Sequence, residues 1–229
     1  RNKDEITMEE VRESIYKVAM GPEKKSRIIS DEERKLTAYH ESGHAIAMRT
    51  ISSTAKVQRV SIIPVGQAGG YTMPIANEDK YFYTKQQLQE EIMTLLGGRA
   101  AEAIALGEVS TGASNDLQRA NKIVRNMIVK YGMSESLANI VFQEEDEVFI
   151  GKDYSKVKSY SEGIATKIDQ ETKRIIDECY DKVKAILTDK RNILDTLAHS
   201  LLENERVEAD EFEKIYNGEN PFEVATLPA

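Results

Sequence analysis

The sequence predicts a mainly α fold, a helical bundle with a small β-sheet or hairpin beside one of its helices. Three observations predict it. Apolar residues recur at steps of three and four over several long stretches, capping signals precede two of these stretches, and one short region between them is rich in β-branched residues and glycine. The chain has 229 residues, 40% hydrophobic and 31% charged, which suffices for an ordered globular core.

The first predicted helix covers residues 7–20, and the Gly-Pro pair at residues 21–22 ends it. Its apolar positions follow helical spacing: Met8, Val11, Ile15 and Val18. The polar, basic stretch after it favours an exposed connection. We therefore expect residues 1–22 to form a separate helical region and residues 23–30 to form a linker.

The second predicted helix runs from about Asp31 to about Ile51, with no proline in between. Ser30 and Glu33 have the form of a capping box, in which the hydroxyl and the carboxylate each satisfy an orphan backbone N–H. The region after this helix is rich in β-branched and aromatic residues interrupted by glycines, which favours a small sheet or hairpin. Its two candidate strands are residues 57–64 and 70–73.

Two more helices are predicted in the middle of the chain. Thr84 opens a second capping box, and helical spacing of apolar residues continues from it to Gly107. A loop of Gly, Ser and Thr residues follows. Asn115 is a good N-cap for the next helix, which we expect to end near residues 131–132.

The last third of the chain is predicted to be helical after an irregular segment at residues 133–158. A long, charged amphipathic helix is expected over residues 159–187, and two shorter helices over residues 191–216. We expect one main domain over residues 31–217 and a C-terminal tail over residues 218–229.

Composition excludes several classes of protein. A formal net charge of −8 argues against a nucleic-acid binder, which needs clustered Lys and Arg. Cys179 is the only cysteine, so an intramolecular disulfide and a thiolate zinc cluster are both impossible, and a reducing compartment fits. The sequence contains no run of 18 apolar residues and does not begin with a signal sequence, so we expect the chain as given to be neither membrane-inserted nor secreted.

The strongest chemical signal is the run from His40 to His44, which has the pattern His-Glu-x-x-His within the second predicted helix. Two imidazoles at i and i+4 project from one face and can bind one cation. Glu41 can then take a proton from a water that the metal activates and deliver it to a leaving amine. The pattern predicts a zinc site for peptide hydrolysis, with the small sheet beside the metal-binding helix.

A catalytic zinc ion needs a third protein ligand, and the pattern leaves its identity open. His199, the third and last histidine, is one candidate for this ligand. It lies on a predicted surface helix, where an ordinary polar residue is expected. Glu102 falls on the apolar face of its helix, where a lone carboxylate needs a partner or a metal. Asp116 follows a flexible loop, and its other possible role is to favour a helix N-terminus. Spacing alone does not decide between the two carboxylates.

Several longer segments make the chain resemble the peptidase region of FtsH-type membrane-bound AAA+ zinc proteases over nearly its whole length. They are residues 21–27 (GPEKKSR), 37–45 (TAYHESGHA), 60–64 (VSIIP), 95–102 (LLGGRAAE) and 110–117 (STGASNDL). Ser42 stands where the family usually has Ala, and residues 69–71 also differ from its commoner pattern. Neither difference touches an expected ligand.

The resemblance implies roles for individual residues. It implies that His40, His44 and Asp116 bind Zn²⁺ and that Glu41 is the general base. Glu102 then becomes a residue that accepts a proton from a ligating imidazole and fixes its tautomer. We also expect Gly70, Tyr71 and Thr72 to form a strand whose edge pairs with an extended substrate.

The resemblance also implies an assembly. Proteases of this type are homohexamers at the cytoplasmic face of the cell membrane, and they degrade unfolded or extracted membrane proteins and short-lived cytosolic proteins. Residues 1–22 would be the end of the ATPase module's helical region. The chain contains neither a phosphate-binding loop of the form Gly-x-x-x-x-Gly-Lys-Ser/Thr nor a transmembrane stretch, so ATP and the membrane are expected to act only through segments absent from it.

Two other interpretations compete with a peptidase. The zinc ion could be purely structural, in a non-catalytic, zinc-stabilised hexamerisation module. Glu41 argues against this, because a structural site normally closes with four protein ligands and leaves no unused carboxylate beside the metal. An amidase or another hydrolase that uses the same chemistry is compatible with the motif alone.

Overall fold

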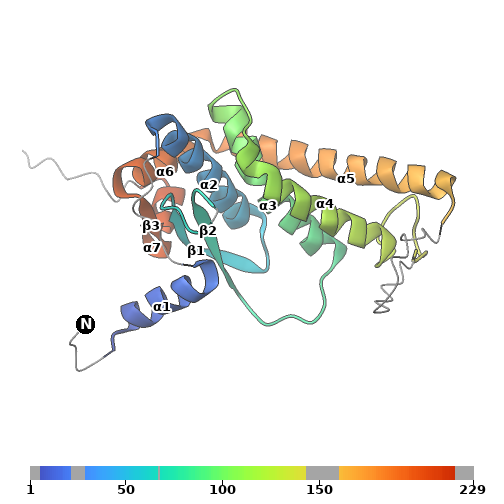
Figure 1. Ribbon diagram of the computed structural model, residues 1–229, viewed down its shortest axis with the longest axis horizontal. Helices are drawn as coiled ribbons and strands as arrows, with labels where there is room; N and C mark the ends of the chain where they lie inside the picture. The colour runs from blue at the N-terminus through green and yellow to red at the C-terminus, as the bar shows by residue number, and fades with distance from the viewer. Residues whose placement is uncertain (1–5, 22–28, 67, 143–159, 220–229) are drawn as a thin grey trace, which may run out of the picture.

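A computed structural model describes residues 6–21, 29–66, 68–142 and 160–219, and it confirms a mainly α fold with a small sheet (Figure 1). The linker expected at residues 23–30 and the tail expected at residues 218–229 lie largely outside these ranges. The helices are α1 (Met8–Met20), α2 (Asp31–Ile51), α3 (Lys85–Ala105), α4 (Ser114–Val129), α5 (Glu162–Asp189), α6 (Arg191–Asn204) and α7 (Ala209–Tyr216), with a short 3-10 turn, η1 (Thr111–Ala113).

Three strands form the antiparallel sheet in the order β2-β1-β3. They are β1 (Ala55–Ser61), β2 (Tyr71–Ala76) and β3 (Arg206–Glu208). The first two overlap the strands expected at residues 57–64 and 70–73, with bounds shifted by one to three residues, whereas β3 lies inside the stretch expected to hold two helices. A single valine, Val207, is too short a signal to predict it. Helix α6 ends at Asn204, and the next residue, Glu205, adopts the left-handed conformation with φ 62° just before the strand.

Side chains cap most of the helices as their sequences predict. Ser30 accepts a hydrogen bond from the backbone N–H of Glu33 at the start of α2. The box at Thr84 and Gln87 is reciprocal. One prediction is wrong: α4 begins at Ser114, so Asn115 lies inside the helix, because η1 runs directly into α4 and takes the place of a side-chain cap.

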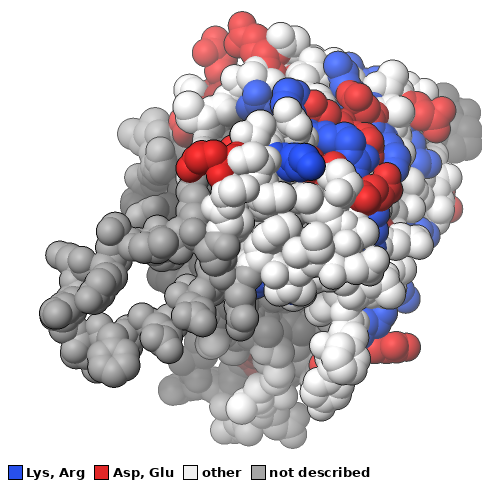
Figure 2. Space-filling view, turned by 90° about the vertical axis from the view of Figure 1, so that its right-hand side faces the viewer, with Lys and Arg blue, Asp and Glu red and all other residues white. Residues whose placement is uncertain are grey.

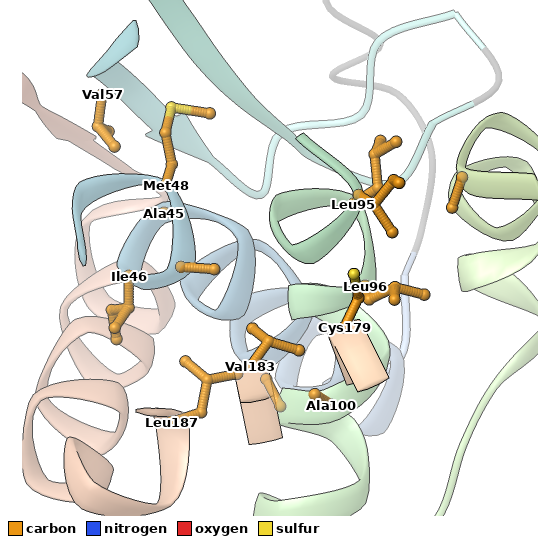
Figure 3. Close-up of a cluster of buried hydrophobic side chains, with 14 of the residues drawn as sticks. Ala45, Ile46, Met48, Val57, Leu95, Leu96, Ala100, Cys179, Val183 and Leu187 are labelled. Atoms are coloured by element: carbon orange, nitrogen blue, oxygen red, sulfur yellow. The ribbon is translucent and has the colours of Figure 1, made fainter. Parts of the chain in front are cut away.

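Helix α2 lies at the centre of the molecule, between α3, α6 and the sheet (Figure 1). Its apolar side meets α3 and α5 in the main core, where Ile46, Leu96, Val183 and Leu187 are almost completely excluded from water (Figure 3). Burial of side chains of this size contributes roughly 2 kcal/mol each. This packing holds α2 and α3 in fixed register.

Helix α1 lies against the sheet, on the far side of it from α4 and α5 (Figure 1). Arg59 of β1 anchors it: its guanidinium lies 2.6 Å from Glu13 of α1, 2.7 Å from Glu208 and 4.0 Å above the ring of Tyr16. Burial lowers the pKa of Arg59, but hydrogen bonds to the two glutamates outweigh it and raise that pKa above its ordinary value. Arg59 therefore fixes α1 on the sheet through charge-assisted hydrogen bonds and a contact with an aromatic ring.

The surface at the end where α5 begins is mixed in charge. Acidic and basic side chains intermingle over the charged part of this face (Figure 2). Among the described helices, none is long and apolar enough to cross a membrane.

Candidate active site

His40 and His44 lie one turn apart on α2, and both are buried. Their Nε2 atoms are 3.0 Å apart, and each is 3.4 Å from Oδ2 of Asp116 in the first turn of α4. These three residues are the group of potential metal ligands found in the described part of the chain, with ligand atoms within 4.8 Å of one another. The helical spacing of the histidines and the packing of α4 on α3 together produce this convergence.

The other ring nitrogen of each histidine is already occupied. His44 Nδ1 lies 2.8 Å from the carbonyl oxygen of Thr94, and His40 Nδ1 lies 2.6 Å from Oε1 of Glu102. A carbonyl oxygen can only accept a hydrogen bond, so Nδ1 of His44 carries a proton. Because a neutral imidazole carries one proton, its Nε2 then presents a lone pair to the centre, and a carboxylate at Nδ1 favours the same tautomer in His40.

In this tautomer three hydrogen-bond acceptors face one another: Nε2 of His40, Nε2 of His44 and Oδ2 of Asp116. A cation bound between them would satisfy all three lone pairs. Zinc bonds of about 2.0–2.1 Å in tetrahedral geometry would separate neighbouring ligand atoms by about 3.3 Å. The observed separations are 3.0, 3.4 and 3.4 Å. Two imidazoles and one carboxylate also match the ligands of catalytic zinc, so the residues present fit this ion.

The pKa values of His40 and Asp116 also indicate that the site favours a bound positive charge. Burial lowers the pKa of His40, but hydrogen bonds to Asp116 and Glu102 outweigh it and raise that pKa to about 10. Burial raises the pKa of Asp116, but the two imidazoles outweigh it and hold that pKa far below its ordinary value. A proton on His40 thus takes the place of the cation when no metal is bound.

Glu102 is completely buried on α3 and lies behind His40 rather than among the converging atoms. Its carboxylate also accepts hydrogen bonds from the backbone N–H (2.6 Å) and the hydroxyl (3.1 Å) of Ser110. Burial raises its pKa, but these bonds and the one from His40 outweigh it, and the pKa is lowered. Glu102 therefore ties an imidazole on α2 to the loop that leads to Asp116.

Three further residues contact the side chains around the two imidazoles and were not predicted from the sequence: Thr94, Ser110 and Gly98. A Cβ on Gly98 would lie 2.6 Å from the ring of His40, so only glycine lets the imidazole lie against the α3 backbone. The Gly97–Gly98 pair inside a long helix was a usable signal, because glycine is unfavourable there without a packing reason. The carbonyl of Thr94 gave no signal, since any residue offers one.

Glu41 lies on α2 beside the two histidines and is only 7% exposed. Burial raises its pKa, partly offset by the neighbouring His44 and His40. Oε2 of its carboxylate accepts a hydrogen bond of 2.8 Å from the hydroxyl of Thr72 on β2. His199 is exposed on α6 and takes no part in the site.

The three strand residues expected to meet substrate lie beside Glu41. Gly70 immediately precedes β2, and a Cβ on it would lie 3.1 Å from Cγ of Glu41. Tyr71 is buried, and Thr72 is half-buried with its hydroxyl directed at Glu41. β2 is an edge strand of the described sheet, paired on one side with β1.

Comparison with known proteins decides the family. Residues 27–215 match the sequence profile described as peptidase family M41. The chain belongs to this family. The M41 match covers all the residues of the site and confirms the expectation of a peptide-bond hydrolase. Together with the relatives named below, it confirms the resemblance to FtsH-type proteases.

Named relatives agree with the M41 assignment. The ATP-dependent zinc metalloprotease FtsH of Ruminiclostridium cellulolyticum is 54% identical over 216 residues, which are 94% of this chain and 35% of that protein. The protein of the same name from Bacillus subtilis is 45% identical over 217 residues, 94% of this chain and 34% of that protein. The one from Thermotoga maritima is 43% identical over 219 residues, 95% and 36%. The chain spans about a third of the length of these relatives.

Proposed function

We propose that this M41 chain is the zinc-dependent endopeptidase part of an ATP-dependent protease. His40, His44 and Asp116 hold the zinc ion, and Glu41 is the general acid and base. The observation that carries the proposal is the convergence of two Nε2 atoms and one carboxylate oxygen within 3.4 Å, next to a buried carboxylate that is not part of the cluster. The donor set and the names of the relatives both support zinc.

A zinc ion held there supplies a Lewis acid that polarises a peptide carbonyl and makes a water nucleophilic at neutral pH. Glu41 takes the proton of the attacking water and passes it to the departing amine. Its burial raises its pKa and so helps it to keep the proton between the two steps. Glu102 and the carbonyl of Thr94 hold the two imidazoles with Nε2 toward the centre.

The substrate that fits this site is an extended, unfolded polypeptide. Glu41 lies under the edge strand β2, and a substrate strand that pairs with the backbone of Gly70, Tyr71 and Thr72 would bring its peptide bonds past the carboxylate. Folded proteins expose few such segments, so an unfolding ATPase would supply them. The name "ATP-dependent" carried by the relatives supports this coupling.

We propose that the ATPase and the membrane anchor belong to parts of the protein outside this chain. The substrates would then be extracted membrane proteins and short-lived cytosolic proteins, degraded by a homohexamer at the cytoplasmic face of the cell membrane. Within the chain, residues 1–22 would be the end of the ATPase module, residues 23–30 a linker, residues 31–217 the peptidase domain and residues 218–229 a tail. The start of the M41 match at residue 27 supports a boundary near the linker.

The test compares zinc content and cleavage of an unfolded protein for the native chain and four variants. We expect Glu41→Gln to keep zinc and lose cleavage by at least about a hundredfold. Asp116→Asn should lose both zinc and cleavage. Glu102→Gln should retain more zinc than Asp116→Asn, and His199→Gln, which changes the one histidine outside the site, should behave like the native chain.

Two results would reject this assignment. Full cleavage by Glu41→Gln would remove the proposed mechanism and leave the non-catalytic, zinc-stabilised module. Normal zinc in Asp116→Asn together with its loss in Glu102→Gln would exchange the two carboxylates as third ligand.

A further inference from the structure

A single hydroxyl from the sheet holds the buried carboxylate of Glu41. Oγ1 of Thr72 lies 2.8 Å from Oε2 of Glu41 and 3.0 Å from the backbone oxygen of the same residue. That backbone oxygen lies inside a helix and accepts the N–H four residues on. Thr72 is the one hydrogen-bond donor to the carboxylate within the described ranges, so the single hydroxyl proton is needed there.

The position of this hydroxyl is fixed by the packing of β2. Successive residues of a strand point to opposite faces, so residues 70 and 72 face α2 while residue 71 faces away. A Cβ on Gly70 would lie 2.6 Å from the backbone oxygen of Ser61 and 2.8 Å from Cγ2 of Thr37, so the strand approaches α2 as closely as the backbone allows. On the other face, Tyr71 is buried, only 6% exposed. The strand has little freedom to move away from Glu41.

We propose that Thr72 is a positioning residue: its hydroxyl acts on the reaction through Glu41 and does not itself contact substrate. The inference rests on the proposed function. The hydroxyl holds Oε2, so that Oε1, which has no protein partner among the described residues, is the oxygen that exchanges protons. A carboxylate held in one orientation avoids the loss of rate that a small misplacement of a general base produces.

The experiment uses the zinc-loaded chain and cleavage of an unfolded protein, with kcat and KM measured separately. Thr72→Val replaces the hydroxyl by a methyl group of similar size and should lower kcat at least about tenfold, with KM unchanged. Thr72→Ser restores a hydroxyl and should stay within about threefold of native. The matched control is Thr172→Val, because Thr172 is also half-buried but donates to the backbone of Ile168 in α5.

Two readouts separate positioning from a general structural effect. Zinc affinity, measured by competition with a chelator, and the unfolding midpoint should be the same in Thr72→Val and Thr172→Val. In a Glu41→Gln background, Thr72→Val should change the residual rate no further, because a residue that acts through Glu41 has nothing left to position.

Three results would overturn the proposal: native kcat in Thr72→Val, a raised KM with unchanged kcat, which would make Thr72 a substrate contact, or a further loss of rate in the Glu41→Gln background. Failure of the proposed function looks different. In that case the zinc-loaded native chain itself does not cleave, and the role of Thr72 is rejected together with it.

Discussion

Gly43 of α2 and Gly97 of α3 meet backbone to backbone where the two helices cross. A Cβ on Gly43 would lie 2.3 Å from the carbonyl oxygen of Gly97, and a Cβ on Gly97 would lie 2.7 Å from the carbonyl oxygen of Gly43. Helix α2 carries the two imidazoles, and α3 carries both of the groups that hold their Nδ1 atoms. The glycine contact therefore sets the distance between the ligands and the groups that orient them.

Replacing Gly97 by Ala should push the two helices apart. We expect the variant to lose at least about 2 kcal/mol of unfolding free energy and to bind zinc more weakly, since overpacking at a backbone contact cannot be relieved by a side-chain rotation. Urea unfolding and zinc titration measure the two effects.

Gly163→Ala is the matched control for this substitution. Gly163 lies in the first turn of α5, and the nearest atom to its Cβ position is 3.9 Å away. Ala there should be neutral or stabilising by up to about 1 kcal/mol, because it removes only the entropic cost of a helical glycine. Equal behaviour of the two variants would contradict the role of the helix crossing.

Ser42 offers a substitution that should stabilise the protein. Its hydroxyl is completely buried and has no hydrogen-bond partner among the residues that the structure describes. Ser42→Ala should raise the unfolding free energy by about 1 kcal/mol, because a buried hydroxyl without a partner costs roughly that much. Ser134 is the comparison: it is also buried, but its hydroxyl donates to Glu171 and accepts from the backbone N–H of Leu137. Ser134→Ala should lose about 1–2 kcal/mol, and a similar loss in Ser42→Ala would show that Ser42 has a partner after all.

The helices and the pair of histidines were predictable because both depend on neighbours in sequence. Capping at Thr84 and the i, i+4 relation of His40 and His44 are local, and the structure reproduces both geometries. Which carboxylate, Glu102 or Asp116, faces the metal-binding nitrogens could not be predicted from neighbouring residues in the sequence. It depends on how α3 and α4 pack against α2, which brings one carboxylate to Nδ1 of His40 and the other to both Nε2 atoms.

Long-range contacts also explain what the sequence did not predict. The position of α1 depends on the ion pairs that Arg59 forms with Glu13, 46 positions earlier in the chain, and with Glu208 on β3. The sequence around a single arginine in a strand does not indicate which distant glutamates will pair with it. At Asn115 a local signal was present but gave the wrong helix start. The residue type favours an N-cap, but η1 runs directly into α4, so the helix begins before Asn115, at Ser114.

Glu102 should govern zinc affinity without being a ligand. Glu102→Gln keeps the shape of the side chain but removes the charge that faces Nδ1 of His40, and we expect zinc affinity to fall about 10- to 100-fold, the usual effect of losing such a partner. Chelator competition at constant pH measures it. Glu90→Gln is the matched control, because Glu90 is a buried carboxylate on the same helix that binds Ser53 instead. It should lower stability and leave zinc affinity unchanged; equal losses of affinity would mean that Glu102 acts only through the fold.

Glu171 should make the stability of the protein depend on pH in the acid range. Its carboxylate is buried on α5 and pairs with Arg174, and this hydrogen bond, with those from Ser134 and the backbone of Glu135, lowers its pKa to about 2. A glutamate in the unfolded chain has a pKa near 4.3. The group therefore stabilises the fold fully above about pH 4.5, and this contribution is lost as the pH falls from there toward 2.

The test follows urea unfolding of native and Glu171→Gln chains, both metal-free, from pH 7 down to pH 3. At pH 7 the native chain should be more stable by about 2 kcal/mol, less than the full pKa difference implies because the guanidinium of Arg174 is partly exposed to solvent. The difference between the two chains should shrink steadily below about pH 4.5. Lys173 and Asp177 supply the control, an exposed pair one turn along the same helix. Asp177→Asn should change stability by less than about 0.5 kcal/mol at any pH in this range, and a constant difference between native and Glu171→Gln would mean that the ion pair does not set the acid response.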